Sequence, residues 1–357
     1  MFTSHILNNP AAHVTFSAPA TPAHDTSYLG LTESQQLALS CGRRVHRVCR
    51  GWFGIIHTLL DQPGVRCVTT RRGVTLDQAP CVHQSRVVDD TLHLFGLQQS
   101  MILRTDAWYS GFAIDIDRAS GTVTRSLRFF DAYGERIFAL ESTAPEGFAP
   151  NLIRPFLDSR QGREHTHVPM PPYSQFQAQP SYMERLERDG IRLWWQMPGD
   201  LPLNEVPGIA DLPRSRLLEI LGTDYAMRVR PEALAMNLLA ECLQAQGPPM
   251  SLRLSVSNVG ACQRTIGPLL EANIRENTLE LSQGPDARLS LALKGVETIW
   301  IVRKPGYQGE ILGIECHDIH GHLLLAIDDH GQPSCPWGEW ASLLRILQPR
   351  TTAWLQT

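Results

Sequence analysis

Histidine side chains are the most chemically versatile groups near the C-terminal end of the chain. His317, His320 and His322 lie close together in the sequence, and His330 follows in an Asp-Asp-His-Gly stretch. Histidine is the commonest metal ligand in proteins. The spacing argues against a metal site, because an Asp-x-x-Gly turn separates His317 from His322 and no fixed geometry brings the three rings together. A structural metal is therefore the minor alternative, and polar loop residues are the main one.

Cysteine usage points to reduced thiols. The eight cysteines are scattered, without a C-x-x-C pair or a spacing typical of a zinc site or a disulfide framework. The sequence also lacks a Gly-rich phosphate loop, a G-x-S-x-G stretch and any pair of carboxylates with better than chance spacing. The common signatures of nucleophilic and phosphoryl-transfer enzymes are thus missing.

Charge and apolar patterning predict a soluble cytoplasmic protein. The net charge of −4 favours neither nucleic acid nor an anionic membrane. Apolar stretches such as 322–327 are far shorter than the roughly 20 residues that span a bilayer, and the N-terminus does not resemble a signal peptide. The 357 residues, 43% of them hydrophobic, can fill two cores of roughly 150 to 180 residues each.

An internal repeat organises the elements around these residues. Residues 112–140 and 300–327 share the order of strand, turn, alternating strand, Asp-x-x-Gly and apolar strand. Asp131 and Asp318 begin the two Asp-x-x-Gly turns and lie 187 residues apart, a separation that we call the repeat offset. Alternation of apolar and acidic residues from Ile114 to Asp117 predicts a half-buried strand. Each repeat therefore contains an antiparallel meander with a hairpin turn at the aspartate.

Further elements repeat on both sides of the meanders. Helices are predicted at 53–60 and 232–239, strands at 65–70 and 252–256, and closing amphipathic helices at 146–157 and 337–347. Prolines and polar residues between the repeats are typical of a linker. The sequence predicts a disordered tail over 1–25, a first repeat over 26–157, a linker over 158–192 and a second repeat over 193–350.

From residue 28 to 347 the chain resembles the cytoplasmic haem-utilisation proteins of Gram-negative bacteria, the hemin-degrading factors of HemS/ChuS type. The resemblance is carried by RSLRFFDAYGERIFAL in the first repeat and IWIVRKPGYQGEILGIECHDIHGHLLLAI in the second. Ser257-Asn-Val-Gly260 is similar to the family's Gly-Asn-Arg-Gly, and 212–229 to its segment after the linker. The resemblance implies an α+β fold that is a tandem duplication of a unit with a large antiparallel sheet and flanking helices, with one haem in a cleft between the units.

Haem requires an apolar slot, cations for two propionates and an axial ligand for iron. By resemblance, Arg214 and Lys304 stand at the family's propionate-binding positions, and Lys304 is one of only two lysines in the chain. A guanidinium fork suits a carboxylate. The alternative is that Arg214 and Lys304 are ordinary solvent-exposed residues, at the start of a helix and the end of a strand. Trp108 matches a strand-end tryptophan, and Arg104 could substitute for a family arginine that aligns with Ile102.

The axial ligand departs from the family pattern. The family's histidine before the arginine matched by Arg214 aligns with Leu201, which has no lone pair for iron, and the prolines at 202 and 207 would disturb the helix that presents it. The family's tyrosine and arginine near the end of the second meander align with Asp328 and Gly331. His330, between them, is the candidate substitute iron ligand, against the alternative of a polar loop residue.

Three functions remain open from the sequence. The first is haem binding and intracellular haem trafficking for iron acquisition with altered ligation, in which the partners implied are a haem import system and a downstream haem oxygenase. The second is an enzyme that opens the haem ring, which the missing histidine counts against. The third is a haem-free scaffold or interaction protein, because function resides in sites placed on a fold.

Overall fold

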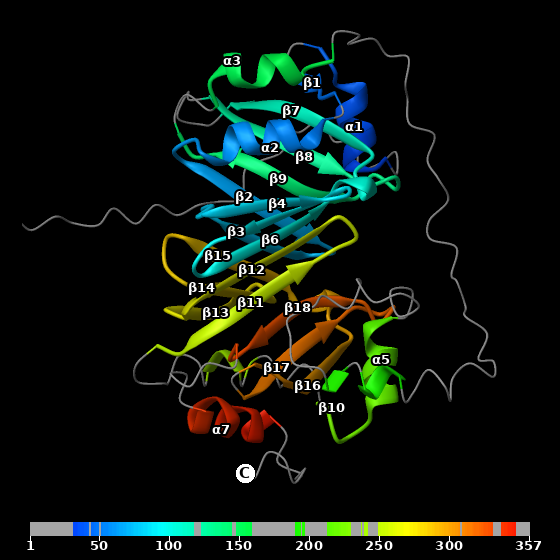
Figure 1. Cartoon of the computed structure of the whole chain (residues 1–357), viewed down its shortest axis with the longest axis vertical. Helices are drawn as coiled ribbons and strands as arrows, with labels where there is room; N and C mark the ends of the chain where they lie inside the picture. Colours follow the sequence, from blue (N-terminus) through cyan, green and yellow to red (C-terminus); the bar gives the residue numbers. More distant parts are fainter. Residues whose placement is uncertain are drawn as a thin grey trace, which may run out of the picture.

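The computed structural model describes residues 31–347, apart from residues 43, 50, 118–122, 145–147, 159–189, 194, 197–212, 230–236, 238, 242–248, 308 and 331–336. The described part is an α+β fold dominated by two nine-stranded antiparallel sheets. The sheets lie one above the other along the longest axis, with α1, α2 and α3 towards one end and α5 and α7 towards the other (Figure 1).

The first half contains α1 (Glu33–Leu39), β1 (Val45–Arg47), α2 (Trp52–Leu60), β2 (Val65–Arg71), β3 (Val74–Gln78), β4 (Gln84–Val88), β5 (Thr91–Phe95), β6 (Gln99–Arg104), the 3-10 turn η2 (Thr105–Ala107), β7 (Ser110–Asp117), β8 (Val123–Phe130), β9 (Arg136–Ser142), α3 (Pro150–Ile153) and η3 (Arg154–Phe156). The second half contains α5 (Arg214–Leu221), β10 (Ala226–Arg228), β11 (Ser251–Ser257), β12 (Ala261–Pro268), β13 (Glu271–Arg275), β14 (Thr278–Ser282), β15 (Ala287–Ala292), η5 (Leu293–Gly295), β16 (Thr298–Pro305), β17 (Glu310–His317), β18 (Leu323–Asp328) and α7 (Trp337–Leu347).

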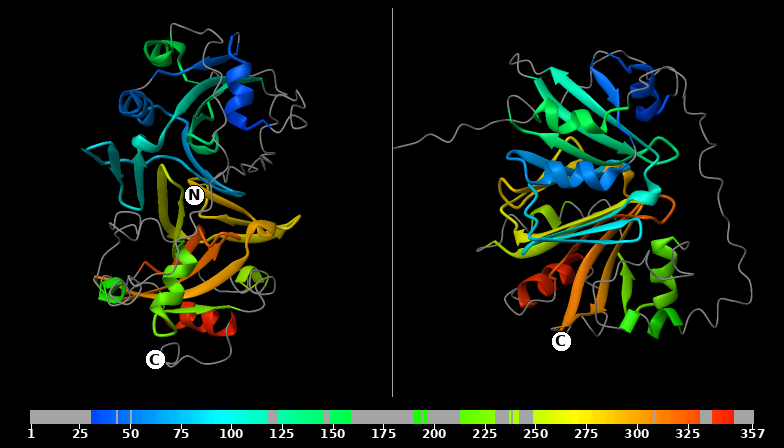
Figure 2. Two further views of the ribbon diagram at one scale, coloured as in Figure 1. Left: turned by 90° about the vertical axis from the view of Figure 1, so that its right-hand side faces the viewer. Right: turned by 45° about the horizontal axis from the view of Figure 1, so that its top comes forward.

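The strand order confirms the duplication. The first sheet runs β1-β7-β8-β9-β2-β3-β15-β14-β13 and the second runs β10-β16-β17-β18-β11-β12-β6-β5-β4. Each strand of one sheet therefore has its counterpart at the same place in the other. Three strands of each half pair with the sheet of the opposite half, through β3 with β15 and β6 with β12. Two further views show the same interleaved arrangement (Figure 2).

The two Asp-x-x-Gly turns are equivalent in their hydrogen bonds. Oδ1 of Asp131 accepts from the amides of Tyr133 and Glu135, at 2.9 Å each. Oδ1 of Asp318 accepts from the equivalent two amides, also at 2.9 Å. Both turns end on a glycine with positive φ, which a residue without Cβ adopts freely. The prediction that these aspartates occupy equivalent hairpin turns is confirmed.

Polar side chains join the sheets where the strands interleave. The Thr69 hydroxyl donates to Oε1 of Gln263 at 2.6 Å, and Nε2 of Gln263 donates to the Cys67 carbonyl at 3.0 Å. The Asn258 amide donates to the carbonyls of Thr70 and Ile137. These bonds satisfy buried polar groups in both halves, and they make the interleaved strands a single hydrogen-bonded unit.

Two local predictions differ from the structure. The first closing helix is only Pro150–Ile153 followed by a 3-10 turn, because Pro155 removes a backbone donor from the second turn. Strand β7 does not alternate: Phe112, Ala113 and Ile114 are all buried, since α1 covers one face and α2 the other. The helices predicted at 53–60 and 337–347 are confirmed as α2 and α7, with α2 starting at Trp52.

The tail over 1–25, the linker over 158–192 and the helix over 232–239 lie wholly or mostly outside the described residues. The repeat boundaries 26–157 and 193–350 remain a prediction. Within the described part, every helix is too short or too polar to cross a bilayer.

Candidate functional site

Arg214, predicted to bind a propionate, is the first residue of α5 and lies against β17. Its Nε and Nη2 donate to the two carboxylate oxygens of Glu315, at 2.8 and 2.5 Å. Both side chains are buried, 12% and 8% exposed. This is the bidentate fork that suits a guanidinium and a carboxylate. Nη1 of Arg214 is also buried and has no hydrogen-bond partner among the described residues.

Glu315 remains charged in this setting. Burial of its carboxyl raises the pKa, but the charge and hydrogen bonds of Arg214, together with the hydrogen bond to His317, outweigh burial and lower the pKa of Glu315 to about 2. Nε2 of the fully buried His317 lies 3.1 Å from Oε2 of Glu315. The arrangement is thus a buried ion pair of Arg214 and Glu315, whose carboxylate also contacts the His317 ring.

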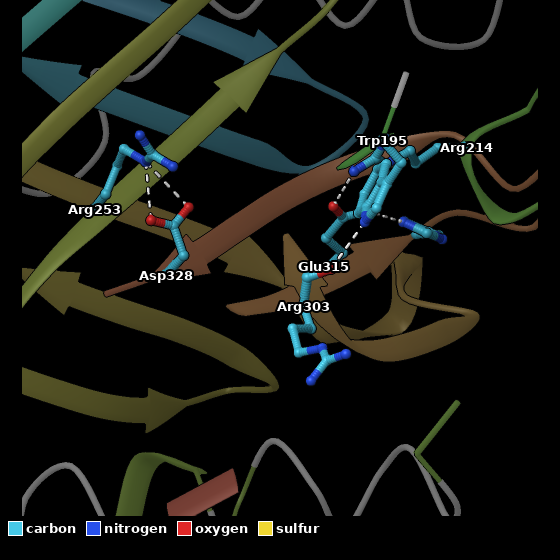
Figure 3. Close-up of polar contacts among 7 residues, drawn as sticks. Trp195, Arg214, Arg253, Arg303, Glu315 and Asp328 are labelled. Carbon is cyan, nitrogen blue, oxygen red and sulfur yellow. Dashed lines mark hydrogen bonds and ion pairs between the residues drawn. The ribbon is translucent and has the colours of Figure 1, made fainter. Parts of the chain in front are cut away.

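Trp195 brings the two predicted propionate-binding residues together. The Arg214 guanidinium lies 4.8 Å from the centre of the Trp195 ring, and Nζ of Lys304 lies 5.8 Å from it. The indole Nε1 donates to the Arg303 carbonyl at 2.9 Å, which holds the ring on β16. Figure 3 shows Trp195, Arg214 and Glu315 gathered on this part of the sheet. Two cations on one aromatic ring form a positive site suited to carboxylates.

The first half contains the same ion pair with its charges reversed. Glu33, the first residue of α1, accepts from Nη1 of Arg128 on β8 at 2.6 Å. Arg128 and Glu315 are separated by the repeat offset and occupy equivalent strand positions. Each half therefore ties the first turn of a helix to the sheet through an Arg–Glu pair. This recurrence gives the Arg214–Glu315 contact a structural role in addition to any role towards a ligand.

Arg104 and Trp108, the other two predicted haem contacts, lie on a different part of the molecule. Arg104 ends β6, which β18, β11 and β12 separate from β17 in the second sheet, and it pairs with Asp106 at 3.3 Å. Trp108 is buried, donates to the Gly260 carbonyl at 2.9 Å and stacks on Phe129 with 4.5 Å between ring centres. The structure does not bring these two residues to Trp195, and their contact with haem stays a prediction.

The position of the family's iron-binding histidine is Leu201 here, and the predicted substitute ligand is His330. Leu201 lies outside the described residues. His330 follows β18, where its Nε2 lies 3.4 Å from Oγ of Ser251. The neighbouring ion pair of Arg253 with Asp328 lies apart from Trp195 along the sheet (Figure 3). His330 as a ligand stays a prediction.

The three clustered histidines have different surroundings, and the rings of His320 and His322 lie near each other, with 6.1 Å between their centres. His317 is buried against Glu315, whereas His322 is partly exposed with Nδ1 3.5 Å from Asp318. Among the described residues, no group of three His, Cys, Asp or Glu side chains is placed to hold a metal ion.

Sequence reasoning missed Glu315 and Trp195. A signal for Glu315 was present: it is a single acidic residue within the apolar strand ILGIECH, aligned with Arg128 of the first repeat. The opposite charges of Glu33 and Arg214 at the two helix starts complete the pattern. Trp195 had no comparable signal in the sequence.

Comparison with known proteins identifies the domain type. A family model described as "Haemin-degrading HemS.ChuX domain" matches residues 30–146 and 211–347. The match is split into two segments that correspond to the two structural halves. None of the curated proteins matches the chain.

Solved structures share the whole fold at low sequence identity. Holo-PhuS, a heme-binding protein from Pseudomonas aeruginosa, is 17% identical with a TM-score of 0.72, over 90% of this chain and 92% of that one. The heme degrading enzyme ChuS of Escherichia coli O157:H7 is 16% identical with a TM-score of 0.73, over the same shares of each chain. At these identities the likeness establishes the fold.

Proposed function

The chain belongs to the HemS/ChuX domain family, and from this premise we propose that it binds haem and takes part in haem utilisation. The observation that carries the proposal is the convergence of Arg214 and Lys304 on Trp195. In a member of this family, two cations beside one buried ring suit the two propionates of a porphyrin.

The residues fit a haem propionate, and the two cations contribute unequally. The Nε and Nη2 donors of Arg214 are already bound by Glu315, so Nη1 is its remaining donor. Lys304, as a compact cation on a flexible stem, can reach an oxygen over a wider range of positions. We therefore assign Lys304 the larger part of propionate binding and Arg214 a shared part.

Iron ligation is proposed to differ from the family pattern, because a leucine occupies position 201. Haem itself supplies the iron centre whose ligation decides between transport and ring chemistry. The proposed place of action is the cytoplasm, between a haem import system and a downstream haem oxygenase. In this role the chain holds the ring by its propionates and its apolar faces.

A hemin titration with matched lysine variants tests the proposal. Purified wild-type protein should give a saturable change in the Soret band at one hemin per chain. Lys304→Gln should weaken binding by about tenfold or more, equal to about 1.4 kcal/mol, because a propionate loses its cation. Lys294→Gln is the control, since it removes the only other lysine. A wild-type spectrum identical to free hemin, or equal loss in the two variants, contradicts the proposal.

A further inference from the structure

The second sheet ends on β4, which pairs with β5 alone among the described strands. In the left view of Figure 2 the cyan hairpin of β4 and β5 lies at the margin of the molecule. Every residue of β4 is exposed. An edge strand presents a row of backbone N–H and C=O groups to which a further strand can bind. The outer edge of β4 is thus a place where the sheet can be extended.

Strand β4 lacks the features that usually block such an edge. Its sequence QSRVV contains neither proline nor lysine, and its pairing with β5 is regular. Val87 and Val88 point to opposite faces and are 49% and 38% exposed. Phe95, opposite Gln84 on β5, is 40% exposed. Exposed apolar side chains therefore accompany the backbone groups of this edge.

The equivalent edge strand of the first sheet is covered. β13 corresponds to β4 by the repeat offset, so Ile274 stands at the place of Val87 and Ala272 at the place of Ser85. Ile274 packs against the buried cluster of the second half, and Ala272 is only 2% exposed. Val87 lies opposite the fully buried Leu92, yet half of its own surface is exposed. The duplicated units therefore differ here, and the β4 edge has an uncovered apolar rim.

The hairpin determines which backbone groups of β4 point outwards. A two-residue turn, residues 89–90, joins β4 to β5, with Val88 opposite Thr91. In such a hairpin the closing pair exchanges hydrogen bonds, and bonded and non-bonded pairs then alternate along the strands. Val88 and Arg86 therefore direct N–H and C=O towards β5, whereas Val87 directs its N–H and C=O outwards. An added strand would form its hydrogen bonds with Val87.

We propose that β4 pairs antiparallel with β4 of a second copy of this chain, with the two Val87 residues opposite each other. A two-fold axis perpendicular to the sheet relates the copies, so residues on the same face meet. Arg86 then lies opposite the partner's Val88 and beside the partner's turn of Asp89 and Asp90. Centring the pair on Arg86 would instead place two guanidinium groups opposite each other, which is destabilising. Charge complementarity therefore selects the register centred on Val87.

The interface formed in this way is small. Five residues on each side bury less than the roughly 1,200 Å² that stable complexes exceed, so we expect a dissociation constant of about 10 to 100 µM. β16 and β17, which surround Trp195, lie near the opposite end of the second sheet from β4. Dimerisation is therefore independent of the proposed haem binding.

Sedimentation velocity of the full-length, haem-free protein tests the association. Wild-type protein should change from monomer to dimer between about 1 and 500 µM. Val87→Lys places two ammonium groups opposite each other and should weaken the dimer at least about tenfold. Glu271→Lys, at an exposed position of the equivalent edge strand β13, is the control and should dimerise like wild type. Wild-type protein that stays monomeric at about 500 µM, or Val87→Lys protein that dimerises like wild type, overturns the proposal.

A charge exchange tests the register. Arg86→Asp places an acidic residue beside the partner's acidic turn, and Asp89→Asn combined with Asp90→Arg places a basic turn beside the partner's Arg86. Asparagine tolerates the positive φ of position 89. Each variant alone should be monomeric, whereas an equal mixture should form a heterodimer, because opposite charges then meet at both contacts. A mixture that associates no more strongly than either variant alone overturns the proposal.

Discussion

Replacing Glu315 by alanine is expected to lower the free energy of unfolding by about 3 to 5 kcal/mol at pH 7. The substitution leaves the Arg214 guanidinium buried without the carboxylate that binds its Nε and Nη2. Urea unfolding followed by circular dichroism measures the loss. Glu33→Ala, which breaks the equivalent but more exposed pair with Arg128, is the matched control and should cost only about 1 kcal/mol.

The loss should depend on pH with a defined sign. Because the pKa of Glu315 is lowered from 4.5 to about 2, the ionised carboxylate stabilises the folded state fully above pH 4.5. This contribution declines as the pH falls from 4.5 towards 2. The difference in unfolding free energy between wild type and Glu315→Ala should therefore be constant from pH 7 to 5 and shrink below that range. A constant difference down to pH 3 would show that the carboxylate does not act as an ion.

A charge reversal separates the ion pair from other effects of the substitution. Arg214→Glu combined with Glu315→Arg reproduces the polarity that Glu33 and Arg128 have in the first half. The double variant should recover part of the stability that each single variant loses, which a double-mutant cycle measures. If the stability losses of the two single variants simply add in the double variant, the two side chains are not coupled. The interpretation that this ion pair attaches the helix to the sheet would then be wrong.

Replacing Leu201 by histidine is expected to strengthen hemin binding by about tenfold or more and to give a sharper Soret band. An imidazole supplies the lone pair that leucine lacks, and an iron–nitrogen bond fixes the orientation of the ring. Leu203→His, the same change two residues on, is the control. The comparison of both variants with wild type uses the hemin titration described for Lys304.

The substitute ligand is tested in parallel. If His330 binds iron, His330→Ala should weaken hemin binding and shift the Soret band, whereas Ser251→Ala, which removes its hydrogen-bond partner, should have a smaller effect. Wild-type protein that already shows an imidazole-ligated spectrum, unchanged by His330→Ala, would mean that another histidine is the ligand and that the alignment at Leu201 is wrong.

The sequence alone determined the features that depend on neighbouring residues. The two Asp-x-x-Gly turns follow from it because the carboxylate binds amides only two and four residues away, and the glycine adopts positive φ. Helices α2 and α7 follow from apolar spacing. The repeated order of elements indicated the duplication, and the matched motifs indicated the family.

Only the tertiary structure decided which charges meet. Arg214 binds Glu315 across 101 residues within the second half. Arg72 of the first half reaches Asp318 of the second across 246 residues, because strands of each half join the sheet of the other half. Strand exchange leaves no local signal, since a strand has the same alternation whichever neighbour it pairs with. The same exchange places Val259 of the second half among the residues that line a cavity of the first half, a contact that local sequence patterns do not specify.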